Sequence, residues 1–120
     1  MDDKLQAVID KLTIQTRAGK IAWTDYSSVS LGEQFHATFG DVLVEVMKGD
    51  YRREDNEVGE YWVEYIRVQV RNHRGFVVAS FESELGQSQY GRLATLHELA
   101  LASARNSEGV LDSLLQKLGA

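Results

Sequence analysis

The segment YWVEYIRVQVR, residues 61–71, gives the strongest strand signal in the chain, because it is rich in the aromatic and β-branched residues that favour sheets. Side chains alternate between the two faces of a strand. One face of this strand is mostly apolar and should lie against helices; it carries Trp62, Glu64, Ile66, Val68 and Val70. The opposite face would lie on the outside of the sheet, with Tyr61, Val63, Tyr65, Arg67, Gln69 and Arg71.

Further strands are predicted on both sides of this segment. FVVASFES, residues 76–83, follows a turn at NHRG and is the expected partner strand. Upstream, EQFHATF (33–39) alternates apolar and polar side chains, and VLVEVMK (42–48) follows a Gly-Asp turn, so these two segments should form a hairpin. KIAWTDY (20–26) is expected to be a short strand or an extended linker, and a loop should follow at 27–32.

The segment GDYRREDNEVGE, residues 49–60, is dominated by charged side chains and contains glycine at both ends. These residues predict a solvated loop or an extended hairpin tip. Its carboxylates lack the spacing of a calcium-binding loop, so they do not predict a metal site.

Helices are predicted at both ends of the chain. Residues 3–18 carry apolar side chains at the i, i+3, i+4 and i+7 spacing of one buried stripe, namely Leu5, Val8, Ile9 and Leu12. Residues 89–105 form a second helix. Ser107 can cap a third helix, whose apolar stripe consists of Val110, Leu111, Leu114, Leu115 and Leu118.

The order of these elements predicts an α+β fold. It consists of an N-terminal helix, an antiparallel sheet of four to five strands, and two C-terminal helices packed on one face. Strands and helices do not alternate along the chain, which argues against a parallel sheet. The length suits a single domain spanning residues 1–120.

The composition excludes several classes of protein. Hydrophobic residues make up 43% and charged residues 26%, as in soluble globular domains. The absence of cysteine excludes disulfides and a cysteine nucleophile. A net charge of −5 disfavours indiscriminate binding to nucleic acid or anionic membranes. We find no secretory signal and no apolar run long enough to span a membrane, so we expect a cytoplasmic protein that does not associate with membranes.

His97 and Glu98 form half of a zinc-protease motif. The complete motif needs a second histidine four residues after the first, but residue 101 is leucine. Neighbours on a helix point about 100° apart, so His97 should lie on the buried face and Glu98 on the exposed face. The sequence therefore predicts no metal, no cofactor and no catalytic residue. A structural histidine is the leading interpretation, and a pocket histidine is the alternative.

The outer face of the strand at 61–71 is the main candidate for binding. Tyrosine and arginine are enriched in protein interfaces, and together they can also stack on bases and hold phosphates. The candidate interface residues are Tyr61, Tyr65, Arg67, Arg71, Arg52 and Arg53. An ordinary exposed sheet face would have the same composition, so a protein interface, a nucleic-acid or nucleotide site and a plain surface all remain open.

A second candidate is a pocket between the sheet and the helices. Trp23 and Tyr26 follow the first helix, and aromatic side chains there either close one end of the core or line a ligand pocket. His97 could lie in the same pocket. The pocket candidates are therefore Trp23, Tyr26 and His97.

The motifs TRAGKIAW near the N-terminus and YGRLATLHELALASA with GVLDSLLQKL near the C-terminus resemble those of a loose group of short bacterial and phage proteins. The group shares Gly-Lys-Ile-x-Trp after a first helix and a Leu-x-x-Leu-x-x-Leu-Ala helix near the C-terminus, and it has no settled function. The resemblance implies the fold given above and a bacterial or phage context, and it implies no catalytic residue.

The sequence thus favours a non-enzymatic protein-interaction module that binds a protein partner, with a homodimer as one form. The bacterial or phage resemblance implies an inhibitor, immunity or accessory role. The alternative is a small-molecule or nucleotide-binding domain with a pocket between sheet and helices. An enzyme that uses His97 or His36 as a general base ranks last.

Overall fold

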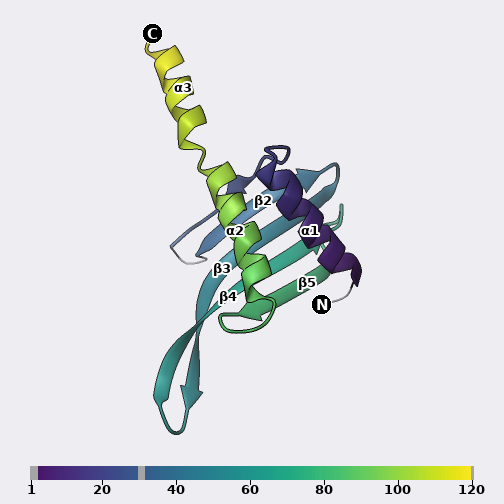
Figure 1. The fold of residues 1–120 in the computed structure, drawn as a ribbon, viewed down its shortest axis with the longest axis vertical. Coiled ribbons are helices and arrows are strands. Elements are labelled where there is room, and N and C mark those ends of the chain that lie inside the picture. The colour runs from purple at the N-terminus through teal and green to yellow at the C-terminus, as the bar shows by residue number, and fades with distance from the viewer. Residues whose placement is uncertain (1–2, 30–31, 120) are drawn as a thin grey trace.

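The computed structural model describes residues 3–29 and 32–119, so residues 30 and 31 of the predicted loop lie outside the described residues. The chain order is helix, five strands, two helices, which confirms the predicted α+β class (Figure 1). The elements are α1 (Asp3–Arg17), β1 (Thr24–Asp25), β2 (Glu33–Phe39), β3 (Val42–Asp55), β4 (Gly59–Arg71), β5 (Val77–Glu84), α2 (Tyr90–Ala104) and α3 (Ser107–Lys117).

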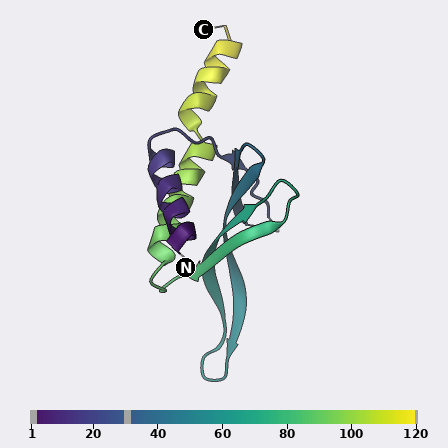
Figure 2. The same ribbon diagram turned by 90° about the vertical axis from the view of Figure 1, so that its right-hand side faces the viewer.

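The sheet is an antiparallel meander in the order β1-β2-β3-β4-β5. Each strand pairs with its neighbour in the chain, as the short turns between the predicted strands require. Helices α1 and α2 lie side by side on one face of this sheet, and no helix of the described residues covers the other face (Figures 1 and 2). We call the covered side the inner face and the open side the outer face.

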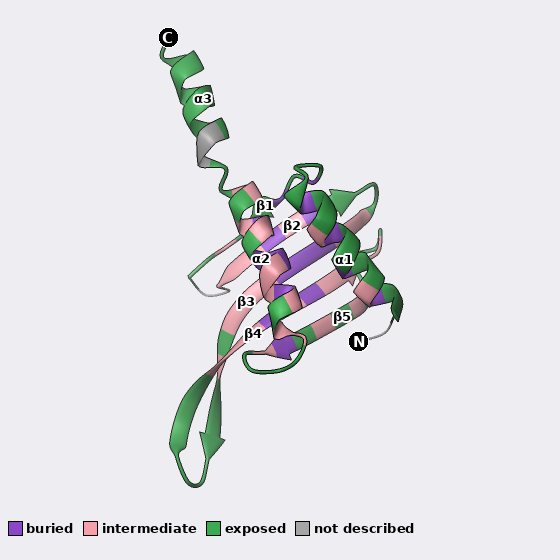
Figure 3. Ribbon diagram, in the orientation of Figure 1, coloured by how far each residue is buried: buried purple, intermediate pink, exposed green. Residues whose placement is uncertain are grey.

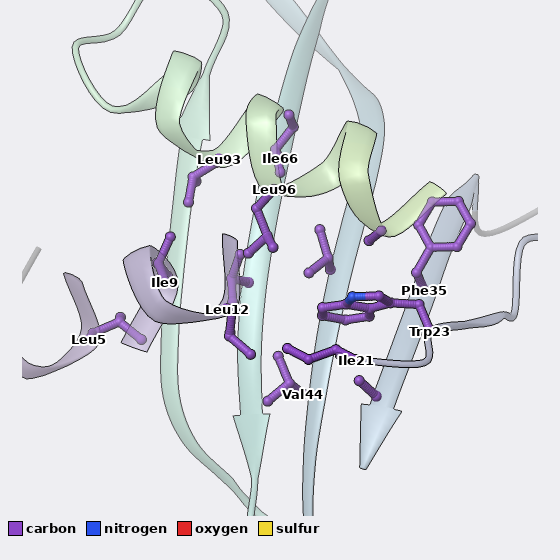
Figure 4. Close-up of a cluster of buried hydrophobic side chains, with 14 residues drawn as sticks. Leu5, Ile9, Leu12, Ile21, Trp23, Phe35, Val44, Ile66, Leu93 and Leu96 are labelled. Carbon is purple, nitrogen blue, oxygen red and sulfur yellow. The ribbon is translucent and has the colours of Figure 1, made fainter. Parts of the chain in front are cut away.

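The core lies between the two helices and the inner face (Figures 3 and 4). On the sheet side, Ile66 and Val68 of β4 are fully buried, which confirms the predicted inward face for the centre of this strand. Helix α2 contributes Leu93 and Leu96, which are also fully buried, and α1 contributes Ile9. Burial of one such side chain stabilises the fold by about 1.5–3 kcal/mol.

The segment after α1 closes one end of the core. Gly19 has a φ of 73°, a conformation that glycine adopts without strain, and it ends the helix. Trp23 is then buried, and its Nε1 donates a hydrogen bond to Oγ1 of Thr16 at 3.0 Å. The hydroxyl of Ser103 in α2 donates to the carbonyl of Ile21 at 3.2 Å. These bonds join the linker to both helices.

Strands β3 and β4 form a long hairpin that extends well beyond the helices (Figure 1). Pairing runs without interruption from Leu43 opposite Arg71 to Asp55 opposite Gly59. The charged segment 49–60 is thus a hairpin tip, which was one of the two predicted alternatives. The prediction that Trp62 faces the helices is wrong, because its part of the hairpin lies past the end of the helical layer; this side chain is 69% exposed.

Helix α3 does not pack on the sheet, so the prediction that both C-terminal helices do so is wrong for this helix. It projects from the end of α2, away from the body (Figures 1 and 3). All members of its apolar stripe are exposed, namely Val110, Leu111, Leu114, Leu115 and Leu118. The physical reason is that α3 continues past the edge of the sheet, where no described element lies opposite its apolar side.

The predicted buried stripe of α1 is confirmed for Leu5, Ile9 and Leu12 but is wrong for Val8, which is exposed. Val8 lies on the flank of α1 and not on the line that faces the sheet, where Thr16 continues the stripe.

Two isoleucines of α1 allow a matched test of this packing. Ile9 is 0% exposed and Ile14 is 63% exposed. We expect Ile9→Ala to lower the free energy of unfolding by about 2–5 kcal/mol, because it removes buried methyl groups and leaves a cavity. The same change at Ile14 should alter it by no more than ~0.5 kcal/mol. Urea denaturation of both variants measures the difference, and equal losses would contradict the described orientation of α1.

Candidate functional site

The first candidate site is the outer face of β3, β4 and β5. Cross-strand register places Tyr65 opposite Gly49 on one side and Glu84 on the other, and it places Arg67 opposite Glu82. A Cβ atom at Gly49 would lie 3.0 Å from Oη of Tyr65, so the tyrosine ring lies over the glycine. The tyrosine and arginine side chains of β4 therefore lie on one face of the sheet, next to side chains of β3 and β5.

The arginines of this surface are paired with carboxylates. Nη2 of Arg67 lies 2.6 Å from Oε1 of Glu82, and Nη2 of Arg53 lies 2.8 Å from Oε2 of Glu84. Arg71 pairs with Glu45. The positive charge of the row is thus largely balanced by neighbouring carboxylates, which weakens its attraction for phosphate.

Arg52, another of the predicted interface residues, lies on the opposite side of the hairpin from Arg53. Consecutive residues of a strand point to opposite faces, and the register places Arg52 opposite Trp62 while Arg53 lies opposite Tyr61. Arg52 pairs with Glu60 there. The hairpin therefore separates the two arginines that the sequence assigns to one surface.

Tyr51 is part of the outer face although it was not among the predicted site residues. Its ring lies 5.7 Å from that of Tyr65, and the guanidinium group of Arg53 lies 5.1 Å above it. Its hydroxyl donates to Glu84, and this hydrogen bond raises the pKa of Tyr51 and lowers that of Glu84. Extending the alternation of β3 past residue 48 would have placed Tyr51 on this face.

A polar cluster lies on the outer face nearer to β1. Glu45 is only 5% exposed there, accepts a hydrogen bond from Nε2 of Gln34 at 3.0 Å, and pairs with Arg71. Nε2 of His36 lies 3.4 Å from the same carboxylate, and the ring of Tyr26 stacks on His36 at 4.2 Å. Burial lowers the pKa of His36; the Glu45 charge opposes this shift and the Arg71 charge adds to it.

The second candidate site is a hollow of about 640 Å³ on the inner face, beside the base of the hairpin. It is lined by Val29, Gly32, Glu33, Lys48, Gly49, Asp50, Trp62, Glu64 and Tyr65. Glu64 is the most connected side chain of this lining. Nζ of Lys48 lies 3.6 Å from its carboxylate, and the hydroxyl of Tyr90 donates a hydrogen bond to it. Burial and then this hydrogen bond raise the pKa of Tyr90 to about 12.

His97 lies beside this hollow, on the buried face of α2. It is 3% exposed, and its Nε2 is 3.3 Å from Oε2 of Glu33. The geometry of that approach is not that of a hydrogen bond, and neither atom has another hydrogen-bond partner among the described residues. Burial lowers the pKa of His97, the Glu33 charge opposes this shift, and the Lys48 charge adds to it. Glu98 is exposed, which confirms the predicted separation of these two side chains.

The structure does not bring the three predicted pocket residues together. Trp23 is part of the core, Tyr26 stacks on His36 on the outer face, and His97 lies on the inner side. Within residues 3–29 and 32–119, no three or more side chains of the kinds that bind metals are grouped to hold an ion.

A scan against protein-family models, a search of curated proteins and a search of solved structures found no match to this chain. None of the helices in the described part of the chain is long and apolar enough to cross a membrane.

The lowered pKa of His97 predicts a pH-dependent stability. Its folded pKa lies below the value of 6.5 for an unperturbed histidine, so the unfolded chain binds more protons in the interval between the two values. The contribution of His97 to stability is therefore complete above pH 6.5 and is lost as the pH falls below it. We expect urea denaturation at pH 7.5 and 5.5 to show a smaller loss of stability in His97→Gln than in the wild type.

His73→Gln is the matched control, because His73 lies exposed in the turn between β4 and β5. This variant should lose as much stability as the wild type over the same pH interval. An unchanged loss in His97→Gln would contradict the assignment of a depressed pKa to this buried imidazole.

Proposed function

We propose that this protein is a non-enzymatic interaction module that binds a partner protein through the outer face. The observation that carries the proposal is that this face has no helix of the described residues over it, while it presents a row of tyrosine and arginine side chains from the neighbouring strands β3 and β4. The central members of this row are Tyr51, Arg53, Tyr61, Tyr65 and Arg67. Large aromatic side chains and arginine are the residues that most often dominate binding energy in protein interfaces.

The contacts within the row support this choice of partner. The guanidinium group of Arg67 lies 5.2 Å above the ring of Tyr65 while it also pairs with Glu82. Side chains held in this way lose less conformational freedom on binding, which favours affinity. Because the glutamates balance the arginines, the surface is better suited to a protein with mixed charge than to a nucleic-acid backbone.

The biological role that fits such a module is that of an inhibitor, immunity or accessory protein acting on a partner in the cytoplasm of a bacterium. This part of the proposal rests on the resemblance to short bacterial and phage proteins and on the lack of cysteine, which suits a reducing compartment.

Capture of the partner from the native host tests the proposal. We expect Tyr65→Ala/Arg67→Ala to bind the recovered partner at least about tenfold more weakly than the wild type, because loss of even one hot-spot side chain costs about 2 kcal/mol or more and about 1.4 kcal/mol corresponds to a factor of ten. Isothermal titration calorimetry with the purified partner measures the loss. Ile14→Ala, on the helical side, is the control and should bind as the wild type does. Equal binding by the wild type and the double variant, with unchanged circular dichroism, would refute the proposed surface.

The hollow beside Glu64 favours a second candidate function, the binding of a small molecule. Glu33, Asp50 and Glu64 contribute three carboxylates to its lining against the single ammonium group of Lys48. This balance disfavours a nucleotide phosphate and favours an amine, for which the exposed ring of Trp62 would provide a cation–π surface.

A thermal-shift screen distinguishes these ligand classes. We expect an amine such as spermidine to raise the melting temperature, since a ligand at one hundred times its Kd stabilises the folded state by about 2.7 kcal/mol. ATP should have no effect, and Trp62→Ala should abolish the shift caused by the amine. If spermidine leaves the melting temperature of the wild type unchanged, the hollow is not an amine-binding site.

A further inference from the structure

Helix α3 is too short to be stable on its own. Isolated helices below about 12–15 residues are marginal in water, and α3 has 11 residues. Its N-terminus is capped, because the side chain of Asn106 accepts a hydrogen bond from the backbone nitrogen of Gly109 at 3.0 Å. Its apolar stripe, however, has no cover; the least exposed member, Leu114, is 49% exposed. The helix therefore needs an apolar partner surface.

Such a surface lies along the flank of α1. It is an open groove of about 680 Å³, which we call the α1 groove, lined by Lys4, Leu5, Val8, Lys11, Leu12, Gln15, Phe39, Val42, Val44, Val70 and Ala79. The groove lies on the side of α1 away from α2. Arg92 of α2 approaches Asp10 at 3.6 Å, and on a helix of 3.6 residues per turn Lys4 and Val8 lie about 120–160° from Asp10.

The groove and α3 match in length. The wall of the groove runs along α1 from Lys4 to Gln15, a rise of about 16 Å at 1.5 Å per residue. The 11 residues of α3 have about the same length. A helix placed here would extend the layer formed by α1 and α2 over the uncovered part of the inner face.

The charges match as well. On α3, Asp112 lies on one side of the apolar stripe and Lys117 on the other, as the helical spacing of these residues requires. The groove has Lys4 and Lys11 on its α1 side, and Asp41 lies exposed in the turn between Phe39 and Val42 on its strand side. Placing the apolar stripe in the groove with Asp112 toward α1 brings opposite charges together on both sides.

The helix of the same copy does not reach this groove. Helix α2 ends at Ala104 and α3 begins at Ser107, so the link spans at most about 11 Å. The groove lies beyond α1, two helix spacings from α2, or about 16–20 Å away. From the short link and the matched surfaces, we propose that α3 of one copy docks in the α1 groove of a second copy, and that the exchange is reciprocal.

Light scattering coupled to size exclusion tests the assembly. The full chain should have a mass close to twice 13.5 kDa over a concentration series. Leu114→Asp and Val8→Asp should each return it to the mass of a single chain, because a buried charge opposes docking from either side. Ile14→Asp, on the exposed side of α1, should leave the dimer intact. A wild-type protein that stays at 13.5 kDa throughout, or a dimer that survives both of the first two changes, would overturn the proposal.

The absence of cysteine allows a second, independent test with introduced thiols. Under mild oxidation, the double variant Val8→Cys/Leu114→Cys should form a covalent dimer on a non-reducing gel, since each thiol meets one from the other copy. Ile14→Cys/Leu114→Cys should stay as single chains. Three results would overturn the proposal: an internal disulfide within one chain, no disulfide at all, or covalent dimers of Leu114→Cys alone, which would indicate pairing of α3 with α3.

Discussion

Burial of the inner face of the sheet beneath two helices is the interaction on which the remaining structure depends. Ile9 of α1 and Leu93 and Leu96 of α2 lie together with Ile66 of β4 between the helices and the sheet (Figure 4). Val68 is buried in the same cluster. A domain of two layers covers only one face of its sheet. The outer face is therefore left without a helix of the described residues. The two helices are also narrower than the inner face, so the long hairpin and the α1 groove lie beyond their edges. Each surface discussed above is a consequence of that geometry.

The polar groups near this core are of two kinds. Glu45 and Glu64 each contact two or more donor groups, so their carboxylate oxygens have partners within the protein. His36 and His97 differ from these carboxylates. Burial lowers the pKa of each imidazole, and each Nε2 atom lies near a carboxylate without a hydrogen bond to it. Protonation of either imidazole would place a charge in a largely dehydrated site, which couples the stability of the layer to pH.

Periodicity predicted most of the fold because it reports which side of an element is apolar. It separated the two faces of β4 around Ile66, and it separated His97 from Glu98 on α2. It does not report what lies opposite an apolar side. Leu114 has the same spacing as a buried leucine, yet it is exposed because α3 extends past the sheet. Trp62 is exposed because its part of the hairpin extends past the helical layer, and the alternation of the strand does not report the length of the hairpin.

The residues of the outer face were predictable only in part. Tyr65 and Arg67 follow directly from the alternation of β4. The carboxylates that balance the arginines come from β5, and only the register of the β4–β5 pair places Glu82 beside Arg67. A sequence contains the charge of each side chain but not this pairing, so the change from a basic surface to a balanced one becomes evident only in three dimensions.

The outer face and the α1 groove lie on opposite sides of one sheet, which determines how the two proposed contacts combine. The groove is lined by inner-face side chains such as Val44 and Val70, whereas Tyr65 and Arg67 point the other way. Docking of α3 from a second copy therefore leaves the outer face of each copy free. A dimer built in this way presents two identical binding surfaces in a fixed relation. For a partner with two matching sites, such bivalence raises the apparent affinity by about 10²–10⁴ without any new contact. Self-association through α3 would then strengthen binding at a surface to which α3 does not contribute a single residue.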